Sequence, residues 1–268
     1  MIHKAVRVNG ATVSWSLSPT NRERLRVVYE RHGVEALLPP ETTDRAALKG
    51  AMEDLKGKDQ LVQSLKSPSK NGYEVVNVTK GTHSNRYDNN FSAWFRDGVI
   101  DTGYGFTDTA RLRERFEYRK GLLAPSAVSK SLAGIVASIM GAVTLYPGTY
   151  WIPQDCLPAW EALARDVEQL GEGTNRLRQL TTVMDCHTMR EVRDAIVKEI
   201  DATVARIAEG LAGGELGDEA LESRRDQALK LHKRIEEYED VLDETLDRLH
   251  ESVKAVEEAA TLATLQTV

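Results

Sequence analysis

Residues 185–187 place a carboxylate, a thiol and an imidazole next to one another in the sequence. Asp185, Cys186 and His187 together could supply a nucleophile and its base, or ligands for a metal ion. Side chains of adjacent residues rarely face one another, however, and aspartate is a preferred capping residue at the start of a helix. We therefore interpret Asp185 as a helix cap and Cys186 as a packed thiol, and keep an enzyme with a site near His187 as a residual alternative.

Asp247 and His250 have the three-residue spacing at which a carboxylate and an imidazole can share a metal ion in a helical bundle. Such a site needs matching ligands on other helices, and the helix expected over 189–211 offers carboxylates but no histidine. The chain also contains no GxxxxGK[ST] phosphate loop, no GxGxxG after a strand, no HExxH and no GxSxG elbow. The sequence therefore predicts no metal site, no cofactor and no catalytic residue, and leans towards a protein that is not an enzyme.

The segment 111–120 is the best candidate for nucleic-acid contact, because its cations can meet phosphates and its interleaved aromatic rings can stack on bases. The arginines in question are Arg111, Arg113, Arg115 and Arg119. Glu114 and Glu117 reduce the local positive charge, and the whole chain has a net charge of -6. Two interpretations stay open: a nucleic-acid-binding patch, or a solvated face that pairs with the acidic C-terminal helices.

The composition indicates an ordinary globular protein. The 268 residues are 41% hydrophobic and 28% charged, which fits neither a disordered nor a membrane-embedded chain. Two cysteines without CxxC spacing argue against a disulfide framework and a structural zinc site. The N-terminal residues contain no apolar signal-peptide core, and the apolar run 132–145 is shorter than the about 20 residues that span a bilayer. We expect a cytoplasmic protein without membrane contact.

The elements expected before residue 185 form an α+β body with a mixed or antiparallel sheet and packed helices, with a possible sub-boundary near residue 120. The first half is expected to contain a hairpin over 5–17 that turns at Asn9-Gly10, helices over 20–32 and 43–55, and four meander strands between 61 and 101. The segment 109–120 fits a basic helix or an edge strand, and we prefer the helix. A helix over 125–145, a strand over 149–153, a helix over 157–170 and a strand over 177–184 complete the body.

Residues 186–268 form a second domain, expected to be a long antiparallel coiled-coil-like hairpin of two helices. Apolar residues recur at helical spacing from Met189 to Leu211, Gly213-Gly214 breaks the helix, and the second arm continues from Asp218 to about residue 260. The predicted interaction seam is Leu231, Ile235, Tyr238 and Leu242. At about 1.5 Å per residue the second arm outruns the first by several turns, which would leave part of its apolar stripe without intramolecular cover.

Two short patterns carry a resemblance: GTYWIP at 148–153, which follows an apolar helix, and EYEDVL at 237–242, within a long charged helix. From about residue 120 onward the chain resembles uncharacterised proteins carried by phages and plasmids, with an α+β body and a C-terminal helical hairpin. The resemblance implies a phage or mobile-element setting and brings no catalytic residues.

These observations predict a non-enzymatic assembly or adaptor protein that self-associates or docks to a protein partner through its helical hairpin. A nucleic-acid-binding protein that uses the basic segment 111–120 is the alternative.

Overall fold

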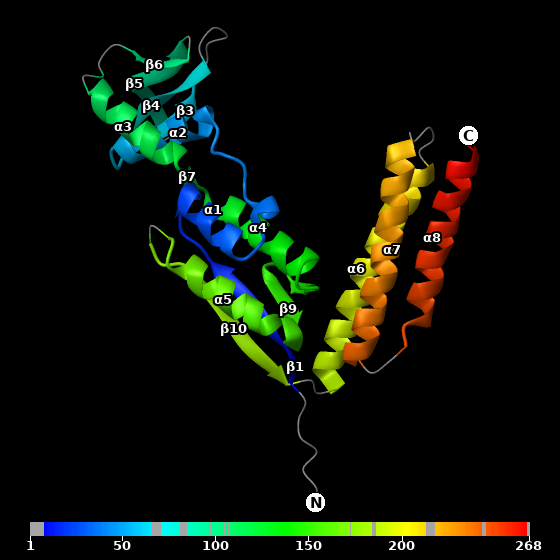
Figure 1. Cartoon of the computed structure of the whole chain (residues 1–268). Helices are drawn as coiled ribbons and strands as arrows, with labels where there is room; N and C mark the ends of the chain where they lie inside the picture. Colours follow the sequence, from blue (N-terminus) through cyan, green and yellow to red (C-terminus); the bar gives the residue numbers. More distant parts are fainter. Residues whose placement is uncertain are drawn as a thin grey trace, which may run out of the picture. The chain divides into compact units, whose positions relative to one another are not determined.

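The computed structural model describes residues 8–65, 71–80, 85–96, 98–103, 106, 108–171, 173–183, 186–212, 218–242 and 245–266. It is a mixed α+β structure with antiparallel sheets and, in this part of the chain, eight α-helices (Figure 1). By contacts the chain divides into unit 1, which contains Met1–Ser16, Leu132–Arg165 and Arg176–Val268, and unit 2, which contains Leu17–Ser131 and Asp166–Asn175. None of the described helices is long and apolar enough to cross a bilayer.

Unit 2 is built around the predicted meander, which is confirmed. Its elements are β2 (Thr20–Asn21), α1 (Arg22–Arg31), the 3-10 turn Glu35–Leu37, α2 (Asp44–Leu55), β3 (Gln60–Ser64), β4 (Asn71–Lys80), β5 (Asn85–Arg96), β6 (Val99–Thr102), α3 (Thr109–Lys120) and β7 (Leu122–Leu123). Strands β3 to β6 are antiparallel neighbours in chain order. Helices α2 and α3 pack against one face of this sheet, and burial of their apolar side chains holds both helices in place. The buried side chains include Leu48, Met52, Leu112 and Phe116.

Unit 1 contains a four-stranded antiparallel sheet in the order β10-β1-β9-β8, together with the C-terminal helices. Its elements are β1 (Val8–Ser16), the end of α4 (Pro125–Ser138), β8 (Val143–Tyr146), β9 (Thr149–Pro153), the 3-10 turn Gln154–Cys156, most of α5 (Leu157–Glu168), β10 (Arg176–Val183), α6 (Cys186–Ala212), α7 (Asp218–Leu242) and α8 (Asp247–Gln266). The expected boundary at residue 185 lies between β10 and α6, whereas contacts group these helices with the sheet. Val143 and Trp151 of the sheet share one buried core with α6, α7 and α8.

The hairpin predicted over 5–17 is wrong, because β1 runs from Val8 through Gly10 to Ser16 and lies between two partner strands. Gly10 serves close packing instead of a turn. A Cβ atom at this position would lie 2.3 Å from the carbonyl oxygen of Ile152 and 2.6 Å from the Trp151 ring. The Asn9-Gly10 pair therefore marks a tight approach between β1 and β9, next to a bulge in the pairing with β10.

The helix predicted over 125–145 ends seven residues early, at Ser138. Gly141 adopts a φ of 58°, the left-handed conformation that commonly follows a helix C-terminus. The Ala142 N–H then donates to the Val136 carbonyl at 2.8 Å, which closes the cap. The apolar residues beyond this cap continue as strand β8, which pairs with β9.

The C-terminal helices are present, but the predicted continuous second arm is wrong, because α7 ends at Leu242 and α8 begins at Asp247. Glu239 of α7 is linked to the residue just before α8, because its carboxylate accepts a hydrogen bond from the Leu246 N–H. This backbone hydrogen bond, together with His250, lowers the pKa of Glu239. Because α8 folds back, α6, α7 and α8 lie side by side as three helices (Figure 1).

Candidate functional site

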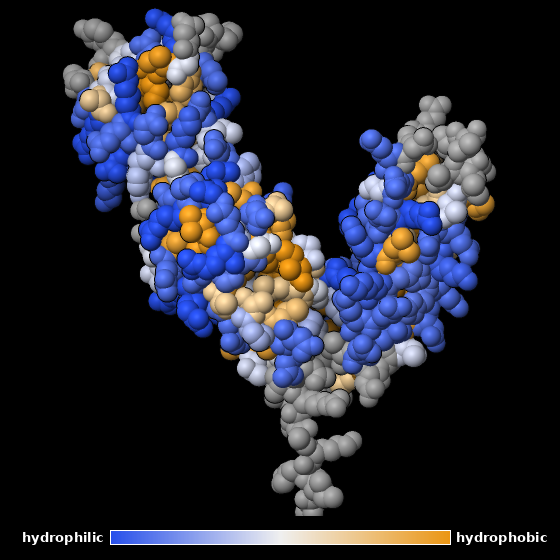
Figure 2. Space-filling model, viewed as in Figure 1, coloured by the Kyte–Doolittle hydropathy of each residue, from blue (hydrophilic) through white to orange (hydrophobic). Residues whose placement is uncertain are grey.

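The predicted interaction seam on α7 is buried within the chain. Leu231, Ile235, Tyr238 and Leu242 all belong to the core shared with α6 and α8. Figure 2 shows hydrophilic side chains over most of the visible surface of the C-terminal helices. The prediction of an exposed seam is therefore wrong, because the break between α7 and α8 supplies the intramolecular cover that a single straight arm would lack.

Arg234 connects α7 to the end of α4 and to α6. Its guanidinium donates to the Ala142 carbonyl and to the Tyr238 hydroxyl, each at 2.9 Å, and forms an ion pair with Glu199 at 2.9 Å. The Tyr238 hydroxyl in turn donates to the Gly141 carbonyl at 2.9 Å. Charge-assisted bonds of this kind are among the stronger ones in proteins, so this network fixes α7 against the α4 cap.

Burial affects the two ionisable groups of this network differently. It raises the pKa of Tyr238 to about 12, so the hydroxyl stays protonated and can donate at neutral pH. Burial opposes the charge of Arg234, but Tyr238 and Glu199 raise the pKa of the guanidinium overall. Both groups therefore act as fixed structural donors.

Beside this network lies a groove of about 420 Å³ between the end of α4 and α7. The residues that line it are Ala137, Ser138, Ile139, Gly141, Lys230, Leu231, Lys233, Arg234 and Glu237. Ile139, one of these lining residues, is 53% exposed and so offers an accessible apolar side chain. Lys230 and Lys233 also line the groove, and Lys233 makes a long 3.8 Å contact with Glu237. The groove thus combines an accessible apolar side chain with a cationic rim.

The basic segment forms helix α3, the preferred of its two predicted structures, and two of its cations pair with carboxylates of α2. Arg119 pairs with Asp54 and Lys120 with Asp44 at 2.9 Å, and both carboxylates lie on α2. Arg113 donates to the Ile100 carbonyl at 3.3 Å. Two of the cations in this segment are therefore paired with α2, inside unit 2.

In the described part of the chain, no carboxylate lies within ion-pair distance of the three remaining arginines of α3. These are Arg111, Arg113 and Arg115. The Arg115 guanidinium lies 5.9 Å from the centroid of the Tyr118 ring. The segment therefore keeps three cations that are not neutralised by an ion pair, fewer than the sequence suggested.

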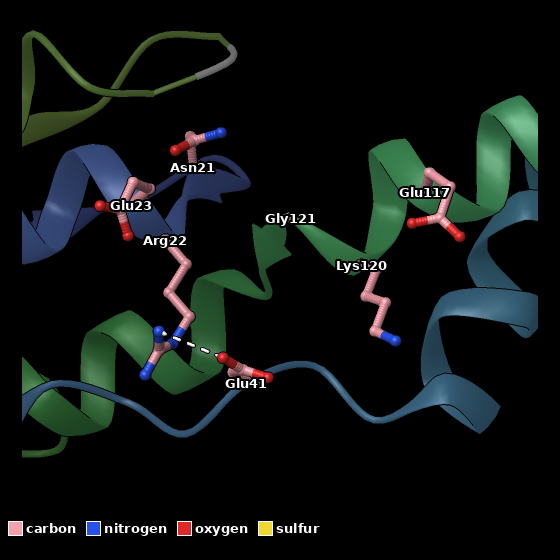
Figure 3. Close-up of a pocket in the computed structure, with 7 residues that line it drawn as sticks. All are labelled: Asn21, Arg22, Glu23, Glu41, Glu117, Lys120 and Gly121. Atoms are coloured by element: carbon pink, nitrogen blue, oxygen red, sulfur yellow. Dashed lines mark ion pairs between the residues drawn. The ribbon is translucent and has the colours of Figure 1, made fainter.

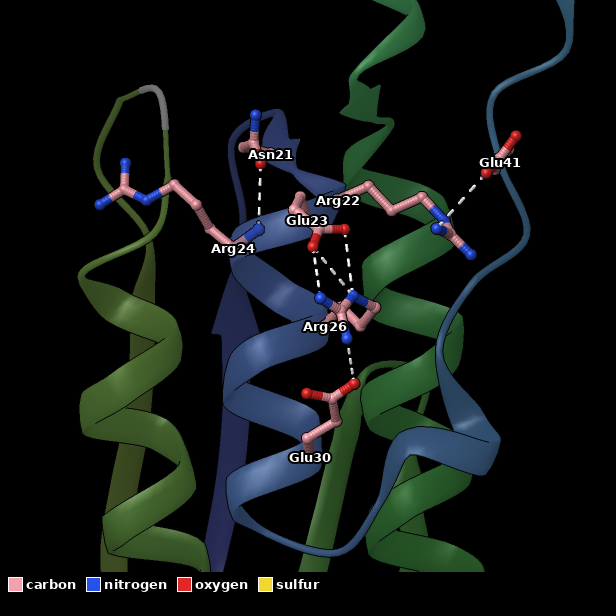
Figure 4. Close-up of polar contacts among 7 residues, drawn as sticks. All are labelled: Asn21, Arg22, Glu23, Arg24, Arg26, Glu30 and Glu41. Carbon is pink, nitrogen blue, oxygen red and sulfur yellow. Dashed lines mark hydrogen bonds and ion pairs between the residues drawn. The ribbon is translucent and has the colours of Figure 1, made fainter.

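A second pocket, of about 340 Å³, lies where α1 begins and α3 ends (Figure 3). Four of the charged side chains that line it already have ion-pair partners in the chain, namely Arg22, Glu23, Glu41 and Lys120. Arg22 lies 3.7 Å from Glu41, and Glu23 holds Arg26, which also pairs with Glu30 (Figure 4). The contact with Arg26 lowers the pKa of Glu23. Most of the charged side chains that line this pocket are therefore already paired within the chain, which leaves little attraction for a charged ligand.

The residues considered for nucleophilic chemistry do not form a described site. Asp185 lies outside the described residues, and the side chain of Cys186 is not described. His187 is an exposed residue of α6, 3.4 Å from Glu191. Burial, together with nearby carboxylates, raises the pKa of the Cys156 thiol, which disfavours the thiolate that a nucleophile needs.

His250, which has metal-ligand spacing to Asp247 in the sequence, lies between two other side chains in the structure. The structure brings it to Glu239, with 3.2 Å between Nε2 and Oε2, and to His232, with 3.4 Å between the two Nδ1 atoms. His232 lies 3.4 Å from Glu257 on its other side. Sequence reasoning missed His232, because only the break between α7 and α8 brings it to His250. Among the described residues, no group of three or more His, Cys, Asp or Glu side chains is arranged to hold a metal ion.

Comparison with known proteins gives one family. Neither a curated protein nor a solved structure matches the chain significantly. The model of the DUF6744 family, described as a family of unknown function, matches residues 10–267. The match includes segments of both units. The chain therefore belongs to the DUF6744 family.

Proposed function

We propose that this protein is a non-enzymatic adaptor or assembly protein that docks a protein partner in the groove between the end of α4 and α7. The observation that carries the proposal is the half-exposed Ile139 beside Lys230 and Lys233. An apolar side chain at a concave, positively charged surface fits a partner segment that offers an aliphatic residue next to carboxylates.

The groove is suited to docking because its walls are fixed before a partner arrives. Gly141 and Ala142 at the end of α4 accept hydrogen bonds from Tyr238 and Arg234 on α7. A surface that is already ordered loses little conformational entropy on binding. The coiled-coil character expected of the C-terminal helices then serves as support within the chain, and the phage or mobile-element setting implied by the resemblance is part of the same proposal.

A site-specific photo-crosslinker tests the proposal. We would place the crosslinker at position 139 of the full chain, express this variant in the organism whose genome encodes the protein, and identify the adduct by mass spectrometry. The matched control is position 229 on α7, where Leu229 is 47% exposed and is not one of the residues that line the groove. We expect a defined adduct from position 139, and its loss when Lys230 and Lys233 are both changed to glutamate.

The adduct also distinguishes self-association from docking to a different protein. An adduct between two copies of this chain indicates self-association, and an adduct with a different protein identifies the partner. Equal labelling from positions 139 and 229, or no defined adduct from either, would contradict docking in the groove.

A nucleic-acid-binding function is the second candidate, because Arg111, Arg113 and Arg115 have no ion-pair partner within the described residues. Arg119, which pairs with Asp54, drops out of the predicted set. Phosphate contacts predict that affinity falls steeply with salt, and that the triple alanine variant loses binding while Arg119→Ala retains most of it. Absence of binding to single- and double-stranded probes at low salt would exclude this function.

A further inference from the structure

His232 on α7 and His250 on α8 face each other in an unusual way. Their Nδ1 atoms are 3.4 Å apart, and their ring centroids are 5.7 Å apart with an interplanar angle of 19°. The centroid separation is close to the nitrogen separation plus the two ring radii. The rings therefore meet edge to edge, with the two Nδ1 atoms pointing towards each other, and are not stacked face to face.

The outer nitrogens of both rings determine where the protons lie. Nε2 of His250 is 3.2 Å from a carboxylate oxygen of Glu239, and Nε2 of His232 is 3.4 Å from one of Glu257. An ionised carboxylate only accepts hydrogen bonds, so each neutral ring is expected to carry its proton on Nε2. Both Nδ1 atoms are then left with lone pairs directed at each other, an arrangement that attracts a cation between them.

We propose that His232 and His250 form a two-histidine binding site for a divalent transition-metal ion, such as Zn²⁺, between α7 and α8. Two metal–nitrogen bonds of about 2.0–2.1 Å to atoms 3.4 Å apart enclose an angle close to tetrahedral. The ion lies slightly to one side of the line between the nitrogens, so each ring turns a little to meet it. Imidazole nitrogen is a preferred ligand for such ions.

The surroundings of the pair match those of known histidine metal ligands. A ligating histidine usually donates its other ring N–H to a carboxylate, the position that Glu239 and Glu257 occupy here. Both imidazoles are partly exposed, which leaves the remaining coordination positions to water. Residues 186–268 contain 20 acidic and 11 basic residues, so the field of this segment also favours a cation.

Titration of the full chain, free of any affinity tag, with Zn²⁺ in a calorimeter tests the site. We expect saturable binding of one ion, and at least about tenfold weaker binding for His232→Gln and for His250→Gln, because each leaves a single imidazole. The matched control is His187→Gln, which removes an exposed histidine of α6 and should bind like the unchanged chain. Circular dichroism checks that each variant is folded.

Imidazole ¹⁵N NMR supplies a readout that folding alone does not change. Zn²⁺ is expected to shift the Nδ1 resonances of both residues and to leave their Nε2–H groups in place. Saturable binding that persists in the double variant, or coordination through Nε2, would overturn the proposal. Absence of any one-to-one binding would show that the pair is only a contact between the two helices.

Discussion

Changing Tyr238 to phenylalanine is expected to make the protein less stable at neutral pH but less sensitive to alkali. At neutral pH the variant leaves the Gly141 carbonyl and the Arg234 guanidinium without their shared partner. Buried polar groups that lose a partner cost about 1–3 kcal/mol.

The alkaline effect follows from the pKa of Tyr238, which burial raises from 10.0 to about 12. Because the folded state favours the protonated hydroxyl, its contribution is complete below pH 10 and is lost as the pH rises towards 12. Proton linkage puts this loss at about 1.4 kcal/mol by pH 11, and close to 3 kcal/mol above pH 12. Phenylalanine does not titrate and removes this loss.

The assay is urea unfolding of the full chain between pH 8.5 and 11.5, followed by far-ultraviolet circular dichroism. Lysines and exposed tyrosines also titrate in this range, so the relevant quantity is the difference in slope between the unchanged chain and the variant. Tyr29→Phe is the matched comparison, because burial raises the pKa of Tyr29 to about 12 as well, but in unit 2.

The two variants should each remove part of the alkaline loss, and the double variant should remove both parts. If Tyr238→Phe loses stability with pH as steeply as the unchanged chain, the hydroxyl is not held protonated by burial, and the assignment of the Arg234 network as a structural clamp is refuted.

Three further predictions concern stability. Gly10→Ala should cost about 1–3 kcal/mol in urea unfolding, because the new Cβ overlaps the Ile152 carbonyl, and no loss would show that β1 can move away. Glu239→Gln should make stability fall less steeply with decreasing pH below pH 4.5. The reason is that folding lowers the pKa of the Glu239 carboxyl, so the ionised group stabilises the unchanged chain and this stabilisation is lost as the pH falls. An equally steep loss of stability in the variant would contradict this. A double-mutant cycle between Arg119 and Asp54 should give a coupling of about 0.5–1 kcal/mol, and zero coupling would return Arg119 to the set of available cations.

Most of unit 2 could be predicted because its signals are local. Asn21 and Thr43 cap α1 and α2 as their sequence positions indicate, with side-chain oxygens that accept backbone N–H groups three residues on. The meander strands carry apolar residues at alternate positions, such as Tyr73 and Val75 or Phe91 and Ala93, because one face of the sheet is covered by α2 and α3. Local propensity and burial agree here, so the sequence pattern and the structure agree.

The errors arise where one local pattern fits two tertiary settings. Asn-Gly favours a hairpin turn, but in β1 the absence of a Cβ at Gly10 permits close approach to β9. The apolar run 132–145 fits a helix throughout, but Gly141 ends α4 and the remaining apolar residues are buried as strand β8. Glycine supports a turn, a helix cap or close packing, and the neighbours that decide between them are distant in sequence.

The apolar stripe of α7 shows why the candidate site could not be predicted either. Helical periodicity indicates which side of a helix must be covered, but that apolar side can be covered either by a partner molecule or by another helix of the same chain. The cover here is α8, and its return depends on a turn held by the Glu239 carboxylate. That turn buries the predicted seam and also brings His232 to His250, so the feature that removes the predicted interface creates the proposed metal site.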